Sequence, residues 1–185
     1  MKDLRKLTYS AMLLAIAMIS MVVKGAGSVF VIFITGAIVN ACIIIDTYLC
    51  GLIWGVILSI ITPVAAYFIS PNPVHQTIPI VVPCIMAGNA ILAAAVALLG
   101  KKDGMGRLNG FMLPLSMLTG SVAKSAFMGI VISLIILPNM LPEAMMGKLA
   151  ALQFSFSLVQ LFAALVGSVY AFIVLKIVGR RAENL

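Results

Sequence analysis

Charged side chains are scarce in this chain of 185 residues. Only 9% of the residues are charged, whereas 63% are hydrophobic. A soluble domain carries roughly 25% charged residues. The chain therefore lacks the side chains that would cover a water-facing surface, and we expect most of its surface to face lipid. We expect a single domain that covers residues 1–185.

Residues that build catalytic and metal sites are also few. The chain has one histidine, His75, and three cysteines, Cys42, Cys50 and Cys84, none of them in CxxC spacing. This set matches no familiar zinc site, so we expect neither a metal nor a cofactor. No GxxxxGK[ST] loop for nucleotide phosphates is present. With so few candidate groups, we expect that the protein is not an enzyme.

Long apolar runs dominate the chain. A membrane-spanning helix needs about 20 mostly apolar residues. Continuous apolar runs favour helices over strands, because a helix satisfies its own backbone groups in lipid. We predict an all-α membrane protein, a compact bundle of six transmembrane helices. The predicted spans lie at about 7–23, 28–45, 48–69, 79–99, 111–137 and 149–175.

Polar and proline-rich segments separate these runs. Residues 70–77, Ser-Pro-Asn-Pro-Val-His-Gln-Thr, predict a loop between the third and fourth spans. Residues 138–143, which begin at Pro138, are predicted to separate the fifth span from the sixth. We expect a tight connection between the second and third spans near Asp46 and Thr47.

Basic residues are distributed unequally between the two sides of this arrangement. The net charge of +7 would suggest nucleic acid as a partner of a soluble protein, but here the basic residues flank apolar runs. An excess of Lys and Arg marks the cytoplasmic side. Only Lys24 and Lys148 lie on the other side, so both termini are predicted to be cytoplasmic and the loops at 24–28, 70–78 and 138–148 to face outward. The nine residues of the basic side are Lys2, Arg5, Lys6, Lys101, Lys102, Arg107, Lys176, Arg180 and Arg181.

Lys124 lies near the centre of the fifth predicted span. A lysine at that depth costs about 2.5–3.5 kcal/mol on insertion scales. No acidic residue of the sequence lies at the same depth, so a bound anion, such as a substrate carboxylate, could act as its counter-ion. The alternative is a neutral or snorkelling lysine bonded to carbonyl groups.

Other polar residues lie around the same predicted half of the bundle. Asn89 lies in the middle of the fourth span, and Gln153, Ser157 and Gln160 share one face of the sixth. These positions predict a pocket that opens outward, although hydrogen bonds between helices, worth roughly 1 kcal/mol or less each, are the alternative. Asn40 is expected to lie too deep to reach this pocket.

The polar outer loop contributes a further group of candidates. Asn72, His75 and Gln76 lie within residues 70–77. A loop that borders an outward pocket could close over it as a lid, and these three residues would then contact substrate. Solvent exposure of the loop, without any contact to substrate, is the alternative.

Small residues at four-residue spacing mark helix contacts in membranes, because lipid supplies no hydrophobic drive between helices. Gly51 and Gly55 form one such pair in the third span. Ala11 and Ala15 form another, directly after the basic N-terminal segment. Ala163, Gly167 and Ala171 form a longer stripe in the sixth span.

Four stretches together resemble the substrate-binding S components of energy-coupling factor (ECF) transporters. These are residues 7–17 (Leu-Thr-Tyr-Ser-Ala-Met-Leu-Leu-Ala-Ile-Ala), 61–66 (Ile-Thr-Pro-Val-Ala-Ala), 87–89 (Ala-Gly-Asn) and 154–167 (Phe-Ser-Phe-Ser-Leu-Val-Gln-Leu-Phe-Ala-Ala-Leu-Val-Gly). The resemblance implies a vitamin-capture subunit in a bacterial plasma membrane. It also implies that Ala11 and Ala15 contact a transmembrane coupling subunit, which joins two cytoplasmic ATPases.

The substrate class follows from Lys124 and not from the resemblance. An uncompensated lysine favours a carboxylated or otherwise anionic small molecule, a class that includes niacin, biotin, pantothenate and lipoate. Two further function classes stay open: a stand-alone secondary transporter driven by protons or sodium, and a membrane structural or assembly protein. The first normally needs a buried carboxylate or a broken-helix ion site.

Overall fold

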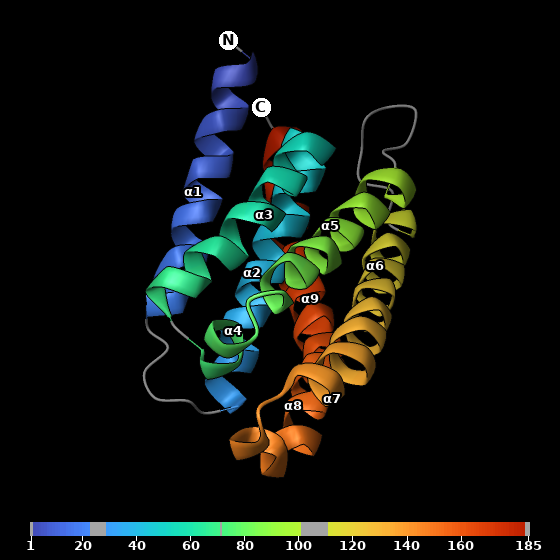
Figure 1. Ribbon diagram of the computed structural model, residues 1–185. Helices are drawn as coiled ribbons and strands as arrows, with labels where there is room; N and C mark the ends of the chain where they lie inside the picture. Colours follow the sequence, from blue (N-terminus) through green and yellow to red (C-terminus); the bar gives the residue numbers. More distant parts are fainter. Residues whose placement is uncertain (1, 23–28, 71, 101–110, 184–185) are drawn as a thin grey trace.

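The computed structural model describes residues 2–22, 29–70, 72–100 and 111–183. Within these ranges every regular element is a helix (Figure 1). The elements are α1 (Lys2–Val22), α2 (Val29–Cys50), α3 (Leu52–Ile69), α4 (Pro73–Thr77), α5 (Val81–Leu99), α6 (Met112–Met128), the π-helix η1 (Gly129–Ile136), α7 (Leu137–Met140), the 3₁₀-helix η2 (Glu143–Lys148), α8 (Leu149–Phe154), the π-helix η3 (Ser155–Val159) and α9 (Gln160–Glu183). The predicted loop at 24–28 and the basic residues Lys101, Lys102 and Arg107 lie outside the described ranges.

Six helical segments are long and apolar enough to cross a membrane, which confirms the predicted helical fold with six candidate spans. Large apolar side chains on their outer surfaces point away from the protein; Ile53 and Phe68 are each 75% exposed. A water-facing surface of this kind would be unfavourable, whereas lipid is as apolar as these side chains. The six segments are Asp3–Val22, Phe33–Cys50, Leu52–Ile69, Val81–Leu99, Met112–Met140 and Glu143–Val178.

The connection between the second and third spans lies at Gly51, so its predicted place at Asp46 and Thr47 is wrong. Both residues lie inside α2, where Thr47 Oγ1 donates to the carbonyl of Ile43 at 2.7 Å and Asp46 accepts from Ser10. Thr47 bonds within its own helix and Asp46 bonds to the neighbouring helix α1, so neither residue requires a loop. Gly51 has a φ of 105°, a left-handed conformation that glycine adopts without a steric penalty.

Pro138 does not end the fifth span as predicted, since helical structure continues to Met140. The chain passes through the π-helix η1 before Pro138, and Pro138 then lies in the first turn of α7. A proline is tolerated in a first turn, because its missing N–H is not needed there. The wider π-turns therefore let one segment run through a residue that normally breaks helices.

The predicted loop at 70–77 contains a short helix, α4. The side chain of Asn72 accepts a hydrogen bond from the backbone N–H of Val74 at 2.9 Å, and Pro73 begins the helix. Asparagine is a favoured N-cap residue and proline a favoured first residue. Val74 and Ile78 are each 2% exposed, so α4 is anchored in the apolar core beneath it.

The helix α2 lies at the centre of the bundle and packs against α1, α3, α5 and α9. Its contact with α9 is close, because a Cβ on Gly167 would lie 2.5 Å from the carbonyl oxygen of Ala37. Ala163 and Ala171 are buried beside it, so the predicted stripe of small residues is confirmed as a helix contact. Gly55 faces its own bundle too, since a Cβ there would lie 1.9 Å from Thr47 Oγ1.

Two of the three apolar cores among the described residues lie at different levels of the bundle. One joins α2, α5, α6 and α9 and includes Ile44, Leu92 and Met117. The other surrounds α4 and includes Met128 and Ile132. The start of α1 and the end of α9 lie at the same end of the molecule, opposite α4, α7 and α8 (Figure 1). The level between the two cores contains the polar residues described next.

Candidate functional site

A cavity of about 170 Å³ opens between α2, α3, α4, α5, α6 and η3, with one further lining residue each from α1, α8 and α9. Its polar lining comes from residues far apart in the sequence: Thr35, Asn40, Thr62, Ser70, Asn72, His75, Asn89, Lys124, Ser155 and Gln160. Its apolar lining includes Met21, Val39, Pro63, Ala66, Val82, Ile85, Leu152 and Phe156. Because Ser70, Asn72 and His75 follow the end of α3, the cavity lies toward the end of the bundle opposite the described ends of α1 and α9.

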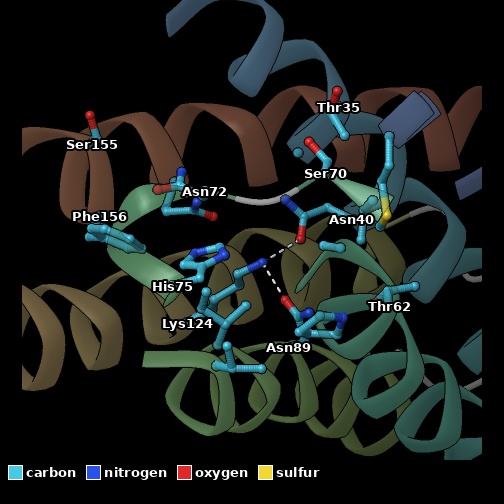
Figure 2. Close-up of a pocket in the computed structure, with 18 of the residues that line it drawn as sticks. Thr35, Asn40, Thr62, Ser70, Asn72, His75, Asn89, Lys124, Ser155 and Phe156 are labelled. Carbon is cyan, nitrogen blue, oxygen red and sulfur yellow. Dashed lines mark hydrogen bonds between the residues drawn. The ribbon is translucent and has the colours of Figure 1, made fainter. Parts of the chain in front are cut away.

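Lys124 on α6 forms the most strongly polar part of the cavity wall (Figure 2). Its Nζ donates to Asn40 Oδ1 on α2 at 2.5 Å and to Asn89 Oδ1 on α5 at 2.6 Å. All three side chains are buried, with exposures of 1% for Asn40 and 3% for Lys124 and Asn89. One lysine thus connects three helices.

Gly88 makes room for this arrangement. A Cβ at Gly88 would lie 3.0 Å from Cγ of Met128 and 3.6 Å from Cγ of Lys124. The absence of a side chain lets α6 approach α5, so the lysine stem passes across α5 and its Nζ reaches the neighbouring amide of Asn89. The glycine is therefore part of the site although it carries no polar group.

The two amide oxygens do not neutralise the lysine. Hydrogen bonds between membrane helices contribute about 0.6 to 1.7 kcal/mol each. Two of them offset the lysine's insertion cost of about 2.5–3.5 kcal/mol only if each bond is near 1.7 kcal/mol, the upper end of its range. The acidic residues with described side chains do not line the cavity: Asp3 and Glu143 are exposed, and Asp46 bonds to Ser10. Within the described part of the chain the cavity wall is therefore basic.

Asn40 lies on the cavity wall, so the prediction that it is too deep is wrong. The reason is the length of α2, which continues to Cys50 and places Asn40 near the middle of the helix. Its Nδ2 is buried and has no hydrogen-bond partner among the residues that the structure describes. In Figure 2 its amide oxygen faces Lys124 and its amide nitrogen is turned away from it.

Five of the eight predicted substrate-binding residues lie together on the cavity wall: Lys124, Asn89, Gln160, His75 and Asn72. Asn72 also caps α4, so its oxygen is already used by the backbone of Val74. The ring of His75 lies 6.3 Å from the ring of Phe156, and the two aromatic groups line the side of the cavity nearest α4 (Figure 2).

The other three predicted residues lie away from the cavity lining. Gln153 Nε2 donates to the carbonyl of Ser133 at 2.8 Å and thereby ties α8 to η1. Ser157 Oγ donates to the carbonyl of Gln153 at 2.6 Å, one turn back along its own segment. Gln76 is exposed on the outer side of α4. The shared face predicted for Gln153, Ser157 and Gln160 is divided by the π-helix η3, because π-turns change the angular spacing of residues.

Sequence reasoning missed several residues of the cavity wall. Thr35, Thr62, Ser70, Ser155 and Phe156 carry no motif of their own, and only the packing of three separate segments, α2, α3 with its C-cap, and η3, brings them together. For Asn40 a signal existed: Gly36 and Asn40 are four residues apart and share one face of α2, which is the face that lines the cavity.

A second buried polar contact lies in the seam between α1 and α2. Ser10 Oγ donates to Asp46 Oδ1 at 2.6 Å, and Asp46 is 0% exposed. The other carboxyl oxygen, Oδ2, has no hydrogen-bond partner within the described ranges. Neither residue lines the cavity, so the two buried polar contacts are separate.

Comparison of the chain with protein-family models, with curated proteins and with solved structures finds no match.

Proposed function

We propose that this protein is the substrate-capture subunit of an ATP-driven micronutrient transporter in a bacterial plasma membrane, similar to the S components of ECF transporters. The observation that carries the proposal is a cavity with a buried lysine in one half of a six-helix bundle. Pockets of this kind, largely apolar with a few converging polar groups, are the usual form of small-molecule sites.

The charge distribution supports an outward-facing cavity. Nine of the basic residues named above lie by sequence at the end that holds both termini, and that end faces the cytoplasm under the positive-inside rule. The cavity lies toward the opposite end, beside α4. A solute would therefore enter from outside, past Asn72 and His75, and α4 would act as the predicted lid.

The surface of α1 supports docking of a transmembrane partner. Ala11 and Ala15 are both exposed, so no other described helix covers this pair. Only 17% of the α1 span is buried, against 56% of the α2 span. Small residues on an exposed helix face allow another helix to approach closely. The coupling subunit would dock here and connect the protein to two cytoplasmic ATPase subunits.

Affinity purification tests the proposal directly. The full-length protein, tagged and extracted from a bacterium that encodes it, should be recovered with one membrane subunit and two ATPase subunits. Native mass spectrometry of the same sample should show a retained small molecule. Solute uptake by vesicles that contain this protein alone, driven by an ion gradient without ATP, would contradict the proposal.

A stand-alone secondary transporter is the second candidate, and the buried carboxyl group of Asp46 favours it. Such transporters use intramembrane carboxylates to couple proton or sodium movement to transport. Asp46 lies six residues along α2 from Asn40 and faces α1 instead of the cavity. If this candidate were correct, Asp46→Asn would abolish gradient-driven uptake in reconstituted vesicles while solute binding remained.

A further inference from the structure

Among the described residues of the cavity wall, Asn40 carries an amide hydrogen-bond donor that is buried and unused. The side chain is 1% exposed, and its Nδ2 has no partner among the described residues, although the same amide's oxygen bonds to Lys124. A buried donor left without an acceptor costs about 1–3 kcal/mol. A ligand that supplies an acceptor would remove that cost.

Lys124 provides a second donor at the same place. A protonated lysine has three N–H donors, and Asn40 and Asn89 accept two of them. The bond to Asn40 Oδ1 is 2.5 Å long, and Asn40 Nδ2 belongs to the same amide, so both residues place a donor at the wall of one cavity. Two donors on one wall match the two oxygens of a carboxylate, which accepts strongly from charged donors.

The rest of the cavity limits the size and character of the ligand. A volume of about 170 Å³ is close to the ~150 Å³ of a cavity that holds benzene. Apolar side chains, among them Val82, Ile85 and Phe156, line the space beside the polar groups. The space therefore suits one small ring with a single charged group.

Resting on the proposed function, we infer that the cavity binds a one-ring carboxylate. One carboxylate oxygen accepts from Lys124 Nζ and the other from Asn40 Nδ2. Asn89 has a different part: it is a positioning residue, which holds Lys124 Nζ against the cavity wall through its own Oδ1. A lipid phosphate is a weaker match, because a cavity of about 170 Å³ has no space for two acyl chains.

Benzoate and benzamide form a matched pair of probes, since they share the ring and differ in charge. Their dissociation constants are measured by isothermal titration calorimetry on the full-length protein in a neutral detergent. Wild-type protein should bind benzoate about tenfold or more tightly than benzamide, because hydrogen bonds to charged groups are the stronger ones. Equal affinities, or no binding of benzoate at millimolar concentration, would overturn the inference.

Two aspartate variants separate the roles of Asn40 and Asn89. Asn40→Asp and Asn89→Asp place the same charge beside the same lysine and keep an acceptor for it. Only Asn40→Asp also replaces the donor that faces the ligand. Asn40→Asp should reverse the preference between the two probes, so that benzamide binds more tightly than benzoate. Asn89→Asp should weaken the binding of benzoate, but benzoate should still bind more tightly than benzamide. Identical behaviour of the two variants would overturn the role given to Asn40.

A second pair keeps the test decisive if an aspartate variant does not fold. Asn40→Leu should weaken benzoate binding at least about fivefold more than Asn89→Leu, because it removes a direct ligand contact as well as an acceptor for Lys124. An equal loss in the two variants would count against the inference. Addition of phosphatidylglycerol should leave the benzoate affinity unchanged, and competition by this lipid would instead assign the site to a lipid headgroup.

Failure of this inference can be told apart from failure of the proposed function. Binding is measured on the isolated protein and needs no ATPase. Preference for benzoate without recovery of ATPase subunits would support the ligand class and reject the transporter subunit. Recovery of ATPase subunits together with equal binding of both probes would support the transporter subunit and reject the ligand class.

Discussion

The first two helices of the chain are both apolar and long enough to span a membrane, yet they are used differently. The helix α2 has 56% of its span buried and packs against four other spans. Only 17% of the α1 span is buried, and its main contacts among the described residues are with α2 and α3. One helix organises the bundle and its cavity, whereas the other leaves most of its surface to lipid or to a partner.

The polar residues of the two helices follow the same division. Asn40 of α2 bonds to Lys124 on the cavity wall, and its buried, unpartnered donor is the one that we assign to a ligand. Ser10 of α1 bonds to Asp46 inside the seam between the helices, where no solute reaches it. The comparison shows that burial alone does not identify a binding residue; a buried polar group must also border a cavity.

The largest effect is expected where α2 meets α9. In Gly167→Ala the new Cβ would lie 2.5 Å from Ala37 O and 2.8 Å from Asn40 Cβ, so the two helices must separate. We expect a loss of about 3 kcal/mol in the free energy of unfolding, at the upper end for overpacking. Thermal unfolding in detergent measures it. Gly129→Ala is the matched control, because its Cβ meets Ser157 at an ordinary 3.5 Å. Equal melting temperatures for the two variants would show that the close α2–α9 contact is not essential.

Lys124→Met tests the side of α2 that faces the cavity, because Lys124 bonds to Asn40 there. Methionine has a similar length but no charge, and it would leave Asn40 and Asn89 without their shared donor. We expect binding of an anionic solute to weaken by about 2 kcal/mol or more, as for a broken buried charge contact. Stability should fall by about 1–2 kcal/mol, because two buried amide oxygens lose their donor, while removal of the buried charge offsets part of that loss. Calorimetry and thermal unfolding of the same sample separate the two effects. Unchanged affinity would assign Lys124 a structural role only.

Ser10→Ala tests how firmly α1 is tied to α2. The change removes the hydroxyl that donates to Asp46 Oδ1. We expect a loss of about 1 kcal/mol in stability, the cost of a buried acceptor left without its donor, and no change in solute affinity. Ser20→Ala is the control on the same helix, because the described bond of Ser20 Oγ runs to Ala17 O one turn back and does not cross to α2. If both variants unfold at the wild-type temperature, the Ser10–Asp46 contact does not hold α1.

The smallest effect on the protein itself is expected on the outer face of α1. Ala11→Leu with Ala15→Leu adds bulk at exposed positions, so stability and solute binding should change by less than about 0.5 kcal/mol. Recovery of the coupling subunit in affinity purification should nevertheless be lost, because the larger side chains prevent close helix approach. Ala123→Leu, at an exposed alanine of α6, should leave that recovery intact. Normal recovery with the double variant would place the docking surface elsewhere.

Composition and hydropathy were sufficient to predict the helical membrane fold. Long apolar runs can satisfy their backbone groups in lipid only as helices, so six such runs predict six spans without any knowledge of packing. The uncompensated Lys124 could also be identified, because a charged residue in the middle of an apolar run is unfavourable unless something compensates it. The stripe at Ala163, Gly167 and Ala171 was informative for a similar reason, since close helix contact in lipid needs small residues.

Only the tertiary structure decided which polar residues meet. Asn40, Asn89 and Lys124 lie on three helices and are up to 84 positions apart, and no periodicity within one helix can show that they share hydrogen bonds. The π-helices η1 and η3 changed the facing of Gln153 and Ser157, and the extension of α2 to Cys50 moved Asn40 to mid-helix. Hydropathy depends on each residue's own transfer free energy, whereas a binding site depends on how helices rotate and pack against one another. The sequence by itself therefore determined the six spans and the isolated lysine, and packing determined which side chains surround it.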